Sequence, residues 1–294
     1  MERILRDKKA ILVFVGPALL LYTLIFMAPT VWSIGYTFFE GNPISGFKWA
    51  GFANFTKVAQ DQDFLDALWF SVKYALVVTT GQVFLGLLLA LMYHFYLKRA
   101  SSVVRTLVFF PVVLPTVAVA EIFAKLFAIA PQYGLINAGL ELVGLTGWVQ
   151  PWLGQANTAF WVLAVMDVWR AMGFYGVILY AGVVEIPNEI IESARLDGAT
   201  GWGLSWFIVR PLLMPIIVSS LILSVNGTLK VFDTVLALTS GGPGDATTPL
   251  TLYMYKTAFT YNQYGYGSTI AVMLMLASLF VTLLVFRSAR KDVA

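Results

Sequence analysis

The sequence predicts an all-α integral membrane protein with six transmembrane helices. Of its 294 residues, 59% are hydrophobic and only 12% are charged, and the mean hydropathy is +0.79. Soluble domains carry about 25% charged residues. Several apolar runs exceed the roughly 20 residues that a helix needs to cross a bilayer, and a helix satisfies its own backbone in lipid. We expect one transmembrane domain over residues 1–294, without repeats or linkers.

Six apolar runs are the predicted spans. They are 10–39, 68–97, 103–129, 158–184, 211–238 and 268–286. The first run is too long for a signal-peptide core and lacks a clear small-residue cleavage site, so we expect it to remain as a helix. The segments 40–67, 130–157 and 239–267 are expected to be outer loops.

The basic residues predict the orientation. The termini, the 98–105 connection and the polar stretch 187–215 carry twelve of them, against three in the other loops. Positive charge favours the cytoplasmic side, so we expect a multi-pass cell-membrane protein with both termini and the polar stretch in the cytoplasm. The twelve are Arg3, Arg6, Lys8, Lys9, Lys98, Arg99, Arg105, Arg195, Arg210, Arg287, Arg290 and Lys291, and the three are Lys48, Lys57 and Lys256.

The composition also excludes several functions. The chain has no cysteine, which excludes thiolate chemistry, and its single histidine, His94, argues against a histidine metal site or a catalytic triad. A net charge of +3 in so apolar a chain does not indicate nucleic-acid binding. No Walker-type loop is present. We expect no enzyme, metal or cofactor here, and any ATP must be bound by another chain.

The polar stretch reads PNEIIESARLDGATGWGLSWFIVRPLLMP and predicts a helix, a tight turn and a second helix. Its first part, residues 187–210, is called the elbow below. Pro187 suits a first helical turn, and the helix dipole favours Glu189 and Glu192 early and Arg195 late. Ile190, Ile191 and Ala194 make a narrow apolar face.

The corner of the elbow is expected at Gly198, which can close a helix in the left-handed conformation. Thr200 can cap a second helix at about 201–209. Such an elbow fits a groove on another protein. On physical grounds alone, an amphipathic loop on the membrane surface is equally good.

The residues of the elbow favour docking into a groove on another protein, because they resemble the EAA loop of importer-type ABC permeases. The matching residues are Glu192-Ser193-Ala194, Asp197-Gly198-Ala199 and then Ile208-x-x-Pro211. Ser193 replaces the family's first Ala but is small enough for close packing, whereas Arg210 replaces the Leu before Pro. The resemblance implies the type I ABC importer permease fold.

The same resemblance implies roles for the elbow residues. Glu192 and Asp197 are expected to face a partner ATPase, and Ala194, Gly198 and Ala199 to permit close approach.

Two outer segments resemble sugar-type permeases, the class that includes maltose-type importers. They are Leu238-Thr239-Ser240-Gly241-Gly242-Pro243-Gly244 and Gly134-Leu135-Ile136-Asn137. The resemblance implies a second homologous permease, two cytoplasmic ATPase subunits that hold ATP and Mg, and an extracellular solute-binding protein. Membrane lipid is the remaining partner.

Polar side chains inside the spans are candidates for the substrate path, because charge within a bilayer is costly. Asn226, Lys230 and Asp233 are spaced as one helical face. Asp167 with Arg170, and Glu121 with Lys125, are the other groups. Asn226 is the best single candidate for a sugar, because an amide both donates and accepts. The alternative for each charged pair is an internal ion pair that fixes helix packing.

We therefore expect an ABC-importer permease that moves a sugar or oligosaccharide inward by alternating access. An importer of another solute, such as a sugar phosphate bound by Arg170 and Lys230, remains an alternative. A non-transporting membrane scaffold and an ATP-independent channel are alternatives from other classes. The polar stripe on the fifth span argues against a scaffold, and the elbow argues against a channel.

Overall fold

The computed structural model describes residues 8–97, 100–129 and 131–293, and forms two compact units. The first unit comprises residues 1–64 and 254–274, and the second comprises 65–253 and 275–294. Each is described by itself, and the expected single domain over 1–294 stays a prediction. Arg3, Arg6, Lys98 and Arg99, used above for orientation, lie outside the described residues.

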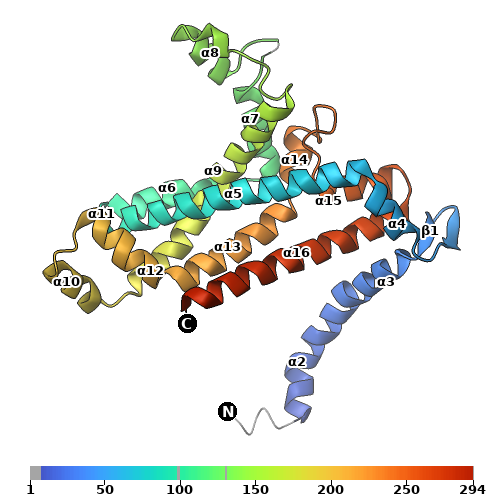
Figure 1. Cartoon of the computed structure of the whole chain (residues 1–294), viewed down its shortest axis with the longest axis horizontal. Coiled ribbons are helices and arrows are strands. Elements are labelled where there is room, and N and C mark those ends of the chain that lie inside the picture. Colours follow the sequence, from blue (N-terminus) through green and yellow to red (C-terminus); the bar gives the residue numbers. More distant parts are fainter. Residues whose placement is uncertain (1–7, 98–99, 130, 294) are drawn as a thin grey trace. The chain divides into compact units, whose positions relative to one another are not determined.

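The first unit begins with one continuous helix, formed by α2 (Lys8–Tyr22), the π-helical turn η1 (Thr23–Met27) and α3 (Ala28–Tyr36). The antiparallel hairpin of β1 (Phe39–Asn42) and β2 (Gly46–Trp49) follows, then α4 (Ala53–Gln60). Figure 1 shows the hairpin directly after α3. The segment 40–67, expected as a loop, contains this hairpin and α4.

A buried asparagine holds this folded segment together. The Asn54 amide nitrogen donates to the carbonyl oxygens of Thr37 and Phe39, both at 2.9 Å. The side chain thereby satisfies backbone acceptors at the start of the hairpin, which is what buried carbonyl groups require.

The second unit is a helical bundle with several short helices in its loops. Its long helices are α5 (Gln62–Phe95) and α9 (Ala156–Val184), and α16 (Tyr264–Val293) enters it from the first unit. The remaining elements are α6 (Ser101–Val113), α7 (Thr116–Leu126), α8 (Leu135–Leu142), η3 (Thr146–Trp148), α10 (Asn188–Leu196), α11 (Gly201–Gly203), η4 (Leu204–Val209), α12 (Arg210–Leu212), α13 (Met214–Leu229), α14 (Asp233–Leu238), α15 (Leu250–Tyr255) and η5 (Lys256–Thr260), of which η5 belongs to the first unit.

Glycines let α9 pack at backbone distance against its neighbours. A Cβ on Gly86 of α5 would lie 2.8 Å from Tyr175 Cβ, and one on Gly173 would lie 2.1 Å from the Val108 carbonyl oxygen of α6. Small residues at such contacts are typical of helix pairs in membranes, because they permit close dispersion contact. The triple α5, α6 and α9 is therefore a tightly packed block.

Within the described residues, four helices are long and apolar enough to cross a membrane, and the number rises to six if two bent helix pairs each count as one span. The chain is thus a multi-pass membrane protein. The pair of α6 and α7 is bent by 97° at Leu114 and Pro115. Leu114 is extended, with ψ 142°, because a residue before proline avoids the helical region. The expected continuous span over 103–129 is therefore broken.

The predicted fifth span, 211–238, is also divided into separate helices. It consists of α12, α13 and α14, and residues 230–232 lie between the last two helices. Helices 201–212 and 214–229 are bent by 72° relative to each other.

Candidate functional site

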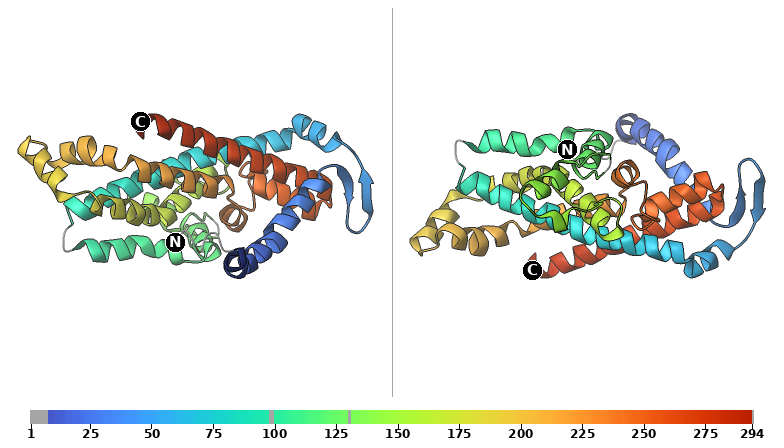
Figure 2. Two further views of the ribbon diagram at one scale, coloured as in Figure 1. Left: turned by 90° about the horizontal axis from the view of Figure 1, so that it is seen from below. Right: turned by 90° about the horizontal axis from the view of Figure 1, so that it is seen from above.

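The elbow has the predicted helix–turn–helix form. Its first helix, α10, begins after Pro187, with Glu189 in the first turn and Arg195 in the last. Gly198 closes it at φ +89°, and the Ala199 amide donates to the Ala194 carbonyl oxygen at 2.9 Å. Both views in Figure 2 place α10 at the end of the second unit, beyond α13. The predicted corner is thereby confirmed.

The elbow has a small apolar core of its own. Ile191, Ala194 and Leu204 are buried against one another, whereas Ile190 is 39% exposed and lies outside this core. Thr200 occupies the predicted N-cap position of α11, but its side chain makes no capping hydrogen bond. The second helix nevertheless runs from Gly201, as predicted.

The residues predicted to contact an ATPase divide between the surface and this core. Glu192, Asp197 and Gly198 are exposed, Ala199 is half-buried and Ala194 is buried. A concave pocket of roughly 460 Å³ opens between the two helices, lined by Glu189, Ile190, Ser193, Ala194, Asp197, Ala199 and Ile208. The elbow thus offers an apolar hollow with carboxylates at its edge.

A network of buried polar side chains centres on Asp167 of α9. Its carboxylate accepts hydrogen bonds from the hydroxyls of Tyr74 on α5, at 2.7 Å, and Thr234 on α14, at 3.0 Å. Arg170 Nε lies 3.5 Å from the same carboxylate, and Arg170 Nη1 donates to the Thr116 hydroxyl of α7 at 2.6 Å. The predicted ion pair of Asp167 with Arg170 is confirmed.

The network continues through Gln82 of α5. Its amide donates to the Asp167 carbonyl oxygen at 3.1 Å and accepts from the Ser224 hydroxyl of α13 at 2.7 Å. Thr79 joins Ser224 and Thr228 with hydroxyl contacts of 3.2 and 3.0 Å. Thr116 begins α7 after the break at 114–115, and Thr234 is the second residue of α14 after the break at 230–232. The network therefore ties the helices that follow these two breaks to α5 and α9.

The other predicted path residues lie elsewhere. Asn226, Lys230 and Asp233 do not form one helical face, because α13 ends at Leu229 and α14 begins at Asp233. Lys230 and Asp233 are exposed. The Asn226 amide donates to the Thr282 hydroxyl of α16 and to the Ile222 carbonyl oxygen, both at 2.9 Å. Asn226 therefore fastens α13 to α16.

Glu121 and Lys125 on α7 are both exposed. Within the described part of the chain they make no ion pair, so the alternative of an internal pair fails for them. They remain candidates for a water-filled path.

Both outer segments that resemble sugar-type permeases are firmly ordered. The Thr247 hydroxyl donates to the Gly242 carbonyl oxygen at 2.6 Å and contacts the Thr239 hydroxyl at 2.9 Å. Asn137 is fully buried, and its amide oxygen accepts from Trp152 Nε1 at 2.8 Å. The amide nitrogen donates to the carbonyl oxygens of Ala128 and Gln150. These hydrogen bonds fix the conformation of both loops.

Sequence reasoning missed the uncharged members of the network. Tyr74, Gln82 and Ser224 are neutral, and neutral polar residues are common in membrane helices. Their signal was available in the helical spacing of Thr79 with Gln82 and of Ser224 with Thr228. Such spacing on an apolar span indicates a polar stripe that needs partners on other helices.

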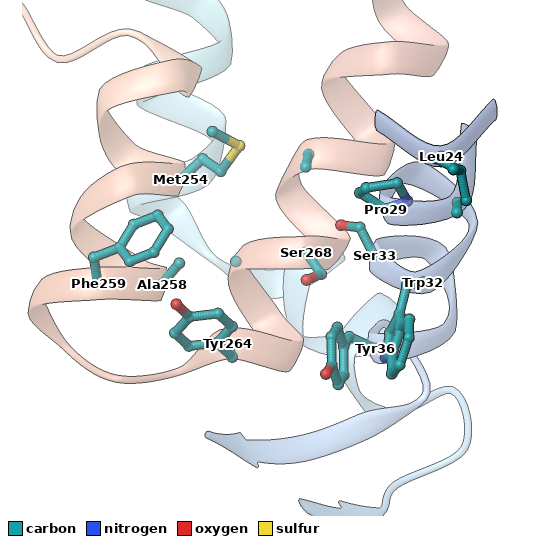
Figure 3. A pocket seen from close by; sticks show the side chains of 13 residues that line it. Leu24, Pro29, Trp32, Ser33, Tyr36, Met254, Ala258, Phe259, Tyr264 and Ser268 are labelled. Carbon is teal, nitrogen blue, oxygen red and sulfur yellow. The ribbon is translucent and has the colours of Figure 1, made fainter. Parts of the chain in front are cut away.

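The first unit holds an apolar groove of roughly 730 Å³. Figure 3 shows Pro29, Trp32 and Tyr36 on one side and Phe259 and Tyr264 on the other, with Ser33 and Ser268 between them. The helix Ile11–Tyr36 forms the first wall, and no residue in its most apolar 18-residue stretch is buried. The groove and this helix therefore leave a wide apolar surface uncovered.

Comparisons with known proteins agree with this architecture. Residues 82–291 match the family described as binding-protein-dependent transport system inner membrane component. The sulfoquinovosyl glycerol transport system permease SmoG of Agrobacterium fabrum is 31% identical over 97% of this chain and 92% of its own. The multiple sugar-binding transport system permease MsmF of Streptococcus mutans is 31% identical over 93% and 92%.

A solved structure has the same fold. It is a chain of a bacterial ABC transporter involved in the import of the acidic polysaccharide alginate, with a TM-score of 0.83 and 23% sequence identity. The similarity covers 98% of this chain and 99% of that one. The expected type I importer permease fold is confirmed.

Proposed function

Because this chain belongs to the family of binding-protein-dependent transport system inner membrane components, we propose that it is the permease subunit of an ABC importer that carries a sugar or oligosaccharide into the cell. It is a membrane permease and not an enzyme. The observation that supports coupling to an ATPase is the elbow, whose Gly198 corner and exposed acidic residues are arranged for docking. The sugar assignment is supported by relatives named for sugar transport.

The proposed mechanism is alternating access. Two cytoplasmic ATPase subunits bind ATP and Mg, and their closure moves the elbow through contacts at Glu192, Asp197 and Ala199. The buried Ala194 keeps the elbow compact, and Gly198 permits its corner. The elbow's movement opens the bundle first to an extracellular binding protein and then to the cytoplasm.

The proposed path runs beside the helix breaks at 114–115 and 230–232. Glu121, Lys230 and Asp233 are exposed and can meet a hydrated solute. Asp167 and Arg170 bind Thr234 and Thr116, which lie beside these breaks. Asn226 holds α13 against α16. A sugar needs several donors and acceptors beside apolar walls, which this mixture provides.

The second permease is proposed to cover the first unit. The helix Ile11–Tyr36 exposes apolar side chains along its length, and the groove beside it is lined by aromatic residues. A homologous chain with the same apolar composition is the partner that suits such a surface inside a membrane. We place both termini and the elbow in the cytoplasm, from the distribution of basic residues.

A neutral sugar is proposed in preference to a sugar phosphate. The charge of Arg170 is balanced by Asp167 at 3.5 Å. Arg170 is therefore less suited to bind a phosphate group. Competition for uptake by neutral and by phosphorylated sugars distinguishes the two. Stronger competition by the phosphorylated sugar would contradict the neutral assignment.

Purification in mild detergent tests the proposal. The chain should co-purify with a second permease and a Walker-motif ATPase. Gly198→Trp should lose the ATPase, since Gly198 has φ +89° and lies exposed at the corner. Gly144→Trp is the matched control, because Gly144 has φ +79° with open space around it in an outer loop. Recovery of the wild-type chain alone would contradict the proposal.

A further inference from the structure

Two residues belong to the apolar core of the elbow and to that of the helix bundle. Phe95 and Ile186 pack against the elbow cluster of Ile191, Ala194 and Leu204, and both also pack against the bundle cluster that includes Leu91 and Leu179. Ile186 directly precedes the elbow in the chain. Phe95 is the last residue of α5 and is distant from the elbow in sequence.

The covalent links of the elbow to the bundle are both bends. At its start, Pro187 is extended, with φ −56° and ψ 134°. At its end, the helix 201–212 meets α13 at a 72° bend. Neither link is a straight continuous helix, so side-chain packing helps to hold the angle of the elbow against the bundle. Phe95 supplies that packing from a third element.

Phe95 lies at the end of α5, which packs closely against α9, and α5 is called the arm below. Gly86 of α5 lies at backbone distance from α9, because an added Cβ would be 3.0 Å from the Gly176 amide nitrogen. A Cβ on Gly81 would be 2.8 Å from the Val168 side chain. Close-packed interiors shift as blocks rather than deforming locally. A displacement at Phe95 therefore moves α5 and α9 together.

The other part of the same arm holds the polar network. Tyr74 and Gln82 of α5 bond Asp167, which also binds Thr234 at the start of α14. Arg170 extends the contact to Thr116 at the start of α7. The arm thus joins the elbow to both helix breaks by contacts that are continuous through the second unit.

We propose that Phe95 is a positioning residue for transport, through which movement of the elbow reaches the helix breaks along α5. The inference rests on the proposed function, because it assumes that an ATPase moves the elbow. It assigns the transmission to a residue outside the EAA-like stretch. Tyr96, the next residue, is 58% exposed and is the matched aromatic control.

The absence of cysteine from this chain makes the test direct. Asp233→Cys places one thiol at the exposed start of α14. In the complete transporter, the labelling rate of that thiol by a charged maleimide is measured with and without ATP and vanadate. We expect ATP to change the rate by at least about fivefold, the lower end of typical coupling effects.

Adding Phe95→Ala should bring the ATP effect below about twofold, with the ATPase still co-purifying and the ATP-free labelling rate unchanged. Phe95→Leu, which keeps most of the apolar volume, should restore a large part of the effect, and Tyr96→Ala should leave it intact. A full ATP effect in Phe95→Ala, an equal loss in Tyr96→Ala, or no ATP effect in the parent each overturns the inference. Failure of the ATPase to co-purify with the parent instead contradicts the proposed function.

Discussion

The elbow and the polar network of Asp167 are built in opposite ways. The elbow buries a few apolar side chains and exposes its acidic ones, whereas the network buries charged and polar groups among apolar helices. Water can replace a lost partner at the elbow surface, but it has little access to the network. Substitutions at the elbow surface should therefore alter function with little change in stability, and substitutions in the network should alter both.

Asp167→Ala is the strongest way to break the network. It removes the acceptor of Tyr74 and Thr234 and leaves Arg170 without its carboxylate, so we expect the free energy of unfolding to fall by about 3 kcal/mol. Thermal unfolding of the detergent-solubilised chain measures the loss. Asp233→Ala, at an exposed site, should change stability by about 0.5 kcal/mol or less. Equal melting temperatures would show that the network carries no stability.

Gly173→Ala tests the close packing that supports the network. The added Cβ would lie 2.1 Å from the Val108 carbonyl oxygen, so α6 and α9 must separate, at a cost of about 2 kcal/mol. Gly227→Ala is the control, because no atom outside its own helix lies within 4 Å of the added Cβ. The control should be neutral or slightly stabilising. Equal unfolding temperatures for the two variants would argue against tight packing.

Ser224→Ala sharpens the comparison within the network. Loss of the hydroxyl removes its bonds to Gln82 and Thr79 and should lower the free energy of unfolding by about 1 kcal/mol. Ser219→Ala should have no measurable effect, since Ser219 is exposed and bonds the carbonyl oxygen of its own helix at Pro215. Chemical unfolding of both variants in the same detergent compares them.

Glu192→Gln should have the smallest effect on folding. Glu192 is exposed on α10, so the free energy of unfolding should change by less than about 0.5 kcal/mol. Affinity for the partner ATPase should fall by about twofold to fivefold, the usual range for one exposed ion pair. Titration of the ATPase onto the immobilised chain measures it, with Glu185→Gln outside the elbow as control. Unchanged affinity would remove Glu192 from the contact.

The sequence was most informative where local chemistry decides the structure. Pro187, Gly198 and the charges of α10 act within one or two turns, so the first helix of the elbow and its corner were predicted from the sequence. The spans 103–129 and 211–238 were predicted as continuous, because apolar composition continues across the breaks at Leu114 and at residues 230–232. At Leu114, the following Pro115 was the local signal for the break. Asn226 and Tyr74 find their partners far along the chain, and no local pattern reports those contacts.

The 97° bend between α6 and α7 has a consequence for biogenesis. At 1.5 Å per residue, the 13 residues of α6 reach about 20 Å and the 11 residues of α7 reach about 17 Å, less than the roughly 30 Å of a hydrocarbon core. Neither half is long enough to be inserted as a span by itself. We therefore expect the two halves to enter the membrane together, and the bend to be held by α9 and α14, which contact α6 and α7 respectively.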